Sequence, residues 1–176
     1  MTTKILIAGF GGQGVLFTGK AIAYTGLKAG LEVSWLPSYG PEMRGGTANC
    51  SVTLSTQQIG SPIVDKPDIL IAMNLPSLEK YMGETERGGY IIYDSSLIDA
   101  NASVDGVTSI GIPATKMASD EGLNGLANMI ILGKAIKESN ILTLDQIKNS
   151  LAQMVPAKKA ELLNNNIKAI ELGYNF

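Results

Sequence analysis

The feature that most constrains the fold is a glycine-rich turn between a strand pattern and a helical pattern. Residues 4–8 form a short apolar run, Gly9-Phe10-Gly11-Gly12-Gln13-Gly14 follows, and apolar residues recur at helical spacing from residue 13 to residue 29. A continuous apolar run suits a central strand that is buried on both faces. The sequence therefore predicts an α/β domain that opens with strand, tight turn and helix.

Further patterns extend this opening unit into a mixed sheet. Residues 32–36 read as a strand that completes a βαβ unit, and residues 48–55 alternate apolar and polar side chains as in a half-exposed antiparallel strand. Three more strands are expected at 69–73, 90–93 and 107–110, and helices at 77–82, 126–137, 144–154 and 158–172. We therefore predict a mostly parallel, mixed sheet flanked by helices in a single Rossmann-like domain over residues 1–176.

Five residues mark the expected ends of helices. Gly30 ends the first helix, and Pro76 sets the start of the second. Thr143 and Gln146 have the spacing of a capping box, and Gly173 is expected to end the last helix.

Composition narrows the classes of function. The formal charge of −2 offers no basic field for nucleic acid. Neither a signal-peptide pattern nor an apolar run of about 20 residues is present, so we expect a cytoplasmic protein that does not cross a membrane. With Cys50 as the single cysteine and no histidine, we expect no metal site, and any iron–sulfur cluster must be held by another chain.

The glycine turn is the candidate binding site. Its G-x-G-x-x-G spacing would let the backbone of Gly9, Gly11, Gly12, Gln13 and Gly14 approach a phosphate at a helix N-terminus. A structural turn without a ligand is the alternative. The acid that NAD requires at the end of the second strand is missing, which disfavours a nicotinamide dehydrogenase.

A second candidate segment, residues 38–46, follows the second strand and contains Glu42 and Arg44. Arg44 could pair with a ligand phosphate. Equally, Glu42 and Arg44 could form a surface pair or contact a partner subunit.

Other reactive side chains give no catalytic pattern. Lys20 could reach an extended ligand but is more simply a solvated side chain, and Cys50 reads as an inert core thiol. Trp35 suits packing or an interface, and Asp94 and Asp120 suit loops or caps. No catalytic residue is predicted on this chain.

Four motifs together resemble the gamma subunits of 2-oxoacid:ferredoxin oxidoreductases. They are the segments GFGGQG at 9–14, YGPEMRGG at 39–46, NMIILG at 128–133 and NIKAIELG at 166–173, which span nearly the whole chain. The resemblance implies the fold of domain III of pyruvate-ferredoxin oxidoreductase. It also implies an enzyme that converts a 2-oxoacid, coenzyme A and oxidised ferredoxin into acyl-CoA, carbon dioxide and reduced ferredoxin.

The resemblance further implies a division of labour among chains. Coenzyme A would be bound partly here, where Gly11, Gly12, Gln13 and Gly14 would present backbone and amide donors to its phosphate and Arg44 would be a charge partner. Thiamine diphosphate and iron–sulfur clusters would belong to partner subunits. Those partners would be the alpha, beta and ferredoxin-like delta subunits, with ferredoxin as acceptor, and the isolated chain could form a homo-oligomer.

Substrate choice lies chiefly on other chains, with 2-oxoglutarate as our leading expectation among 2-oxoglutarate, ketoisovalerate, pyruvate and aryl pyruvates. A subunit of indolepyruvate oxidoreductase, a self-sufficient nucleotide-binding Rossmann protein and a scaffold without a ligand remain the alternatives.

Overall fold

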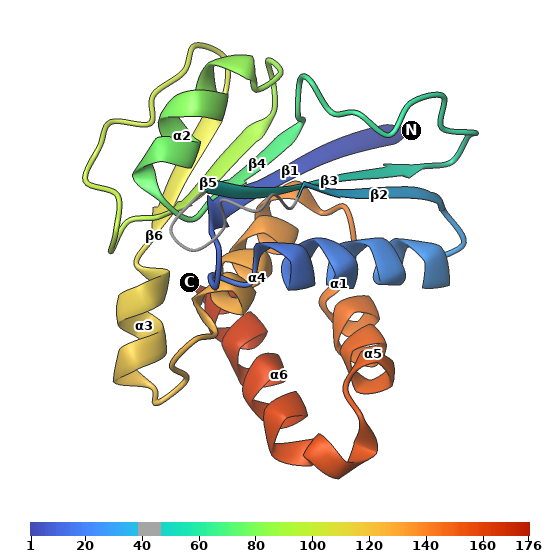
Figure 1. The fold of residues 1–176 in the computed structure, drawn as a ribbon, viewed down its shortest axis with the longest axis vertical. Helices are drawn as coiled ribbons and strands as arrows, with labels where there is room; N and C mark the ends of the chain where they lie inside the picture. Colours follow the sequence, from blue (N-terminus) through green and yellow to red (C-terminus); the bar gives the residue numbers. More distant parts are fainter. Residues whose placement is uncertain (39–46) are drawn as a thin grey trace.

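A mixed sheet of six strands forms the centre of the computed structural model, which describes residues 1–38 and 47–176 (Figure 1). The strand order is β2-β3-β1-β4-β5-β6. The strands are β1 (Thr2–Phe10), β2 (Glu32–Ser38), β3 (Thr47–Ser55), β4 (Ile69–Ala72), β5 (Tyr90–Asp94) and β6 (Thr108–Ile112). Strands β1, β4, β5 and β6 run parallel, and β3 is antiparallel to both of its neighbours. The predicted mixed α/β fold is confirmed.

Strand β3 lies between β1 and β2 and pairs with both. Ser55 at its end is opposite Thr2 of β1 and Glu32 of β2. Because β1 and β2 are each antiparallel to β3, they point the same way without touching. The expected βαβ unit is therefore split by a third strand, which a local pattern cannot reveal.

The expected half-exposure of β3 is wrong. Its polar residues Ser51, Thr53 and Ser55 are all buried. An interior strand has neighbours on both edges, and the short hydroxyl side chains are covered there. The Ser55 hydroxyl lies 2.8 Å from the Thr2 hydroxyl and accepts a hydrogen bond from the Gln57 N–H, so its burial costs little.

Helices cover both faces of the sheet. They are α1 (Val15–Lys28), α2 (Leu75–Tyr81), α3 (Ala114–Asp120), α4 (Ala127–Ser139), α5 (Leu144–Met154) and α6 (Ala160–Asn175), with 3-10 turns at Met82–Glu84 and Ala157–Lys159. Figure 1 shows α1 and α4 against one face, α5 and α6 behind them, and α2 on the other face. Within residues 1–38 and 47–176, no helix is long and apolar enough to cross a membrane.

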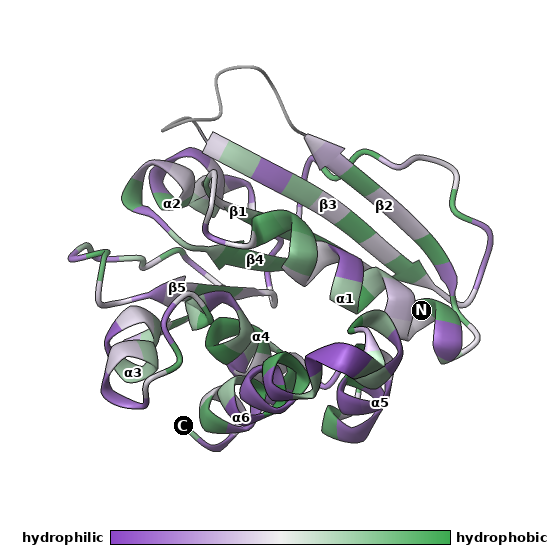
Figure 2. Cartoon of the chain, turned by 60° about the horizontal axis from the view of Figure 1, so that its bottom comes forward, coloured by the Kyte–Doolittle hydropathy of each residue, from purple (hydrophilic) through white to green (hydrophobic). Residues whose placement is uncertain are grey.

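The main core lies between the sheet and helices α1 and α4. Figure 2 shows β1, β4 and α4 largely in the hydrophobic colour, while α5 and α6 have mixed surfaces. Helix α1 approaches β3 closely because Gly19 and Gly26 face the side chains of Cys50 and Leu54, where a Cβ atom would collide. A smaller cluster, which includes Leu6, Leu70 and Leu78, lies under α2.

Several helix ends follow the predicted chemistry. Gly30 has a φ of 80° after the last turn of α1, and the N–H groups of Gly30 and Leu31 donate to the carbonyls of Leu27 and Gly26. The capping box at Thr143 and Gln146 is confirmed. The start of α2 depends on Asn74 as well as on Pro76, because the Asn74 carboxamide oxygen accepts from the Ser77 N–H at 2.8 Å.

Two expectations about helices are corrected. Helix α3 was not predicted, because its seven residues are too few to give a clear apolar period. Gly173 does not end the last helix, since α6 continues to Asn175. Instead, Gly173 faces the backbone of Ile130 on α4, and Gly133 on α4 faces the backbone of Ile170. These glycines allow two helices to touch, which is a tertiary role that looks like a terminator in the sequence.

Candidate functional site

The glycine turn lies at the carboxyl end of β1 and starts α1. Gly12 and Gly14 have φ values of 92° and 79°, in the left-handed region that favours glycine. Among residues 1–38 and 47–176, a Cβ atom on Gly12 would meet nothing within 4 Å, so the described part of the chain leaves this side of the turn open. A Cβ atom on Gly14 would collide with the carboxamide of Asn128. The turn therefore has one open position and one that is packed against α4.

Gln13 ties the turn to the sheet through its side chain. Its carboxamide oxygen accepts from the Phe10 N–H at 2.6 Å, and its Nε2 donates to the Met73 carbonyl at 2.9 Å. Met73 follows β4, and its own N–H donates to the Ala8 carbonyl of β1. Gln13 thus connects the ends of two adjacent strands and fixes the shape of the turn.

Gly9 is needed for the same arrangement. A Cβ atom there would lie 2.7 Å from the Gln13 carboxamide oxygen and 2.9 Å from the Met73 Cβ. The first and fifth positions of the motif therefore act together, because Gly9 leaves the space that the Gln13 side chain occupies.

The start of α1 presents backbone donors. The first helical hydrogen bond runs from the Thr18 N–H to the Gly14 carbonyl at 3.0 Å, so the N–H groups of Val15, Leu16 and Phe17 have no acceptor within the helix. The first turn of α1 has no acidic side chain. Within this turn, no carboxylate opposes the partial positive charge of the helix N-terminus, which favours an anion.

A pocket of about 340 Å³ opens beside the turn. It lies between the turn, the end of β4 and helices α3 and α4, and its lining mixes polar and apolar side chains. The lining residues are Gly12, Gln13, Met73, Thr115, Ala118, Ser119, Asn124, Gly125, Ala127 and Asn128. On the other side of the turn, Phe10 and Phe17 flank a hollow of about 260 Å³, with 39% and 36% of each residue exposed.

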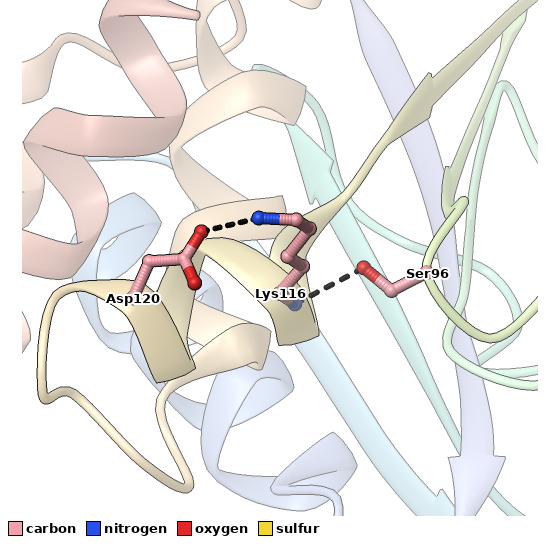
Figure 3. Close-up of polar contacts among 3 residues, drawn as sticks. All are labelled: Ser96, Lys116 and Asp120. Carbon is pink, nitrogen blue, oxygen red and sulfur yellow. Dashed lines mark hydrogen bonds and ion pairs between the residues drawn. The ribbon is translucent and has the colours of Figure 1, made fainter.

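Helix α3 forms one wall of the pocket and is fixed to the sheet by two side chains. Buried Asp94, at the end of β5, accepts from the Thr115 N–H at 3.1 Å and from the Thr115 hydroxyl at 2.5 Å. The Ser96 hydroxyl accepts from the Lys116 N–H at 3.1 Å, and Lys116 pairs with Asp120 at 2.6 Å (Figure 3). Asp94 therefore has the capping role predicted for it, while Asp120 forms a surface ion pair.

Asn128 and Thr18 belong to this site and were not predicted as site residues. Asn128 lies in the first turn of α4, and its Nδ2 donates to the Thr18 hydroxyl at 3.1 Å. Thr18 in turn donates to the Gly14 carbonyl at 3.0 Å. The only signal in the sequence was the position of Asn128 at the start of the NMIILG motif.

The structure brings Gly9, Gly11, Gly12, Gln13 and Gly14 together in one turn beside the larger pocket. The Gln13 carboxamide was expected to face a ligand, but both of its ends bond to the backbone. Arg44 lies outside the described residues, and so does the rest of segment 39–46, so its role stays a prediction.

Cys50 is the buried thiol on β3, and burial raises its pKa to about 11, against a smaller lowering by the hydrogen bond with Trp35. We expect Cys50 of the native protein to react with a disulfide reagent at pH 8 at least about 100-fold more slowly than in urea. In the folded chain little of the thiol is ionised, and the reagent cannot reach the buried sulfur. A native rate equal to the unfolded rate would contradict its burial.

The same pKa predicts how stability changes with pH. Between about pH 9 and pH 11 the folded chain keeps the Cys50 proton that the unfolded chain releases, so the free energy of unfolding should fall as pH rises through this window. Urea unfolding at pH 8, 9, 10 and 11 measures this slope. The variant C50A is the control, since its slope should be shallower than that of the wild type.

The fold and the turn define a Rossmann-like α/β domain whose ligand site would lie at the carboxyl edge of the sheet. The family described as Pyruvate ferredoxin/flavodoxin oxidoreductase matches residues 4–176. The chain therefore belongs to this family, which confirms the prediction made from its motifs.

Relatives with known names agree with this assignment. The chain is 37% identical over 171 residues to the ketoisovalerate oxidoreductase subunit VorA of Methanothermobacter marburgensis, covering 97% of this chain but 35% of that protein. It thus spans about a third of this relative. It is 34% identical to the 2-oxoglutarate synthase subunit KorC of the same organism, with 98% of this chain and 95% of that one covered.

Solved structures show the same fold. A 2-oxoglutarate:ferredoxin oxidoreductase from Magnetococcus marinus, whose structure contains 2-oxoglutarate, coenzyme A and succinyl-CoA, matches with a TM-score of 0.88 and 27% identity. The match covers 99% of this chain and 30% of that one. The gamma subunit of a keto/oxoacid ferredoxin oxidoreductase from Geobacter sulfurreducens matches with a TM-score of 0.83 and 23% identity, covering 98% and 96% of the two chains.

Proposed function

We propose that this chain is the gamma subunit of a cytoplasmic 2-oxoacid:ferredoxin oxidoreductase. The complex would convert a 2-oxoacid, coenzyme A and oxidised ferredoxin into acyl-CoA, carbon dioxide and reduced ferredoxin. Support comes from the relatives named for ketoisovalerate and 2-oxoglutarate, of which the second has nearly the same length as this chain. The full activity belongs to the assembled complex, because this chain has no predicted catalytic residue.

Within the complex, this chain would bind the diphosphate of coenzyme A at the glycine turn. The observation that carries this proposal is the start of α1, where backbone N–H groups without helical acceptors border the 260 Å³ hollow together with Gly12. Gly12 also lines the 340 Å³ pocket, so the two spaces meet at the turn. The backbone of Gly11, Gly12 and Gly14 would contact phosphate oxygens. Gln13 would hold the turn in shape, and Arg44 is proposed as a charge partner.

Partner chains would supply the remaining parts. We propose alpha, beta and delta subunits that carry thiamine diphosphate and iron–sulfur clusters, with ferredoxin as the electron acceptor. In the ketoisovalerate relative, the domain matched here is one third of a longer chain, which supports close association with other domains.

The first test is an anaerobic pull-down of the tagged chain from the cytoplasmic fraction, followed by viologen reduction with a panel of 2-oxoacids. We expect a thiamine-dependent complex that requires coenzyme A and prefers one oxoacid. Activity with an aryl pyruvate alone would favour an indolepyruvate enzyme. A chain that elutes alone, reduces no viologen and binds NADH would overturn the proposal.

The role of the turn is tested separately in the same complex by G12D. This change adds a carboxylate at the open position beside the proposed diphosphate, and we expect coenzyme A affinity to fall at least about tenfold. The matched control is G88D, because Gly88 also has a positive φ, 83°, and open space around its Cα. Equal affinity in both variants would favour a scaffold that binds no coenzyme A here.

A further inference from the structure

Asn128 leaves one hydrogen-bonding atom without a partner. Only 4% of the residue is exposed, and its Nδ2 donates to the Thr18 hydroxyl at 3.1 Å and more weakly to the Gly14 carbonyl at 3.4 Å. Within the described part of the chain, its Oδ1 is buried and accepts no hydrogen bond. An unsatisfied buried acceptor costs about 1–3 kcal/mol, so its presence needs a reason.

The position of this oxygen suggests that reason. Asn128 lies in the wall of the 340 Å³ pocket together with Gly12 and Gln13. Its carboxamide packs closely against Gly14, since a Cβ atom there would lie 2.8 Å from the Asn128 Cγ and 3.3 Å from its Oδ1. Gly12 lines both this pocket and the 260 Å³ hollow that borders the backbone donors of α1, so the acceptor and the donors lie on the two sides of one turn.

The backbone donors of α1 and the Asn128 acceptor together suit a ligand that carries two kinds of polar group. Backbone N–H groups at the start of α1 favour an anion, whereas a carbonyl oxygen favours an N–H or O–H donor. The pocket beyond Asn128 is also mixed in character, with Met73, Ala118 and Ala127 among polar neighbours. A chain of methylene groups interrupted by amides matches such a lining better than a sugar or a bare hydrocarbon.

We propose that Asn128 is a specificity-determining residue that accepts a hydrogen bond from an amide N–H of the pantetheine arm of coenzyme A. This inference rests on the proposed function and adds that the arm enters the pocket between α3 and α4 while the diphosphate lies at the turn. The terminal torsion of asparagine is soft, so rotation of the carboxamide can turn Oδ1 toward the pocket that Asn128 lines.

The experiment compares coenzyme A with ADP in the complex purified through this chain. ADP carries the diphosphate but lacks the two amides of coenzyme A. Comparing the two ligands therefore distinguishes binding of the diphosphate at the turn from binding of the pantetheine arm in the pocket. We expect N128L to weaken coenzyme A binding about tenfold, the effect of a lost buried hydrogen bond, while the inhibition constant of ADP as a competitor stays unchanged.

A further variant controls for structural damage. N166L makes the same change at another buried asparagine with an unpartnered Oδ1, on α6, and should bind both ligands normally.

The possible results distinguish a failure of this inference from a failure of the proposed function on which it rests. If ADP does not compete with coenzyme A for the wild-type complex, the diphosphate site at the turn is wrong and the inference falls with it. If ADP competes but N128L binds coenzyme A like the wild type, or loses both ligands equally, the inference alone is overturned.

Discussion

Replacing Gly173 by alanine is expected to destabilise the folded chain by about 3 kcal/mol, at the upper end of the usual cost of overpacking. A Cβ atom at this position would collide with the carbonyl oxygen of Ile130, and its carbonyl carbon would lie 2.6 Å away. Backbone atoms cannot rotate aside as a flexible side chain can, so α4 and α6 must separate. Alanine's better helix propensity, about 1 kcal/mol, offsets only part of this cost.

Urea unfolding followed by circular dichroism measures the effect. G83A is the control, because a Cβ atom on Gly83 meets nothing within 4 Å and its φ is not positive. The reciprocal variant G133A, whose Cβ would meet the Ile170 carbonyl oxygen, should be similarly unstable. A G173A protein as stable as G83A would show that the two helices lie further apart than described here.

Changing Gln13 to glutamate is expected to cost about 2 kcal/mol of stability and to weaken coenzyme A binding by more than about tenfold. The Phe10 N–H keeps its acceptor, but the bond to the Met73 carbonyl is lost and a carboxylate oxygen faces that carbonyl instead. The same negative charge lies at the start of α1, where the ligand's diphosphate is proposed to bind. The loss of stability and the loss of affinity both follow from replacing the Gln13 Nε2 by a carboxylate oxygen.

The matched control is Q153E, which makes the same exchange on α5 at an exposed side chain that accepts from the Tyr24 hydroxyl. Its stability and coenzyme A affinity should be within error of the wild type. Thermal unfolding and calorimetric titration of the assembled complex give the two readouts. Loss of stability in Q13E with unchanged affinity would place the ligand away from the turn.

Much of the fold follows from local patterns in the sequence. The apolar runs at β1, β4 and β5 and the helical periods of α1, α4 and α5 predict those elements within a few residues. Local patterns could not show which strands lie next to each other in the sheet. The insertion of β3 between β1 and β2 depends on pairing between residues 37 to 53 positions apart, from Phe10–Thr47 to Thr2–Ser55, and the polar side chains of this interior strand are buried.

The candidate site likewise has parts that local sequence patterns predict and parts that they do not. The glycine motif predicts a tight turn at a helix start, because its spacing is a local property of strand, turn and helix. The hydrogen bond from Asn128 to Thr18 joins residues 110 positions apart, so no window of sequence contains it. The role of Gln13 was equally hidden, since its bond to Met73 spans 60 residues.

The position of β3 also determines when the sheet can first assemble. While a ribosome has released only the residues up to Ser38, β1 and β2 are both complete, yet neither has an adjacent strand to pair with. Both acquire a shared partner once Thr47–Ser55 emerges, and β4 can add to the other edge of β1 only later. Nascent chains arrested before residue 55 should therefore remain open to proteases, and protection should rise for β1 and β2 together.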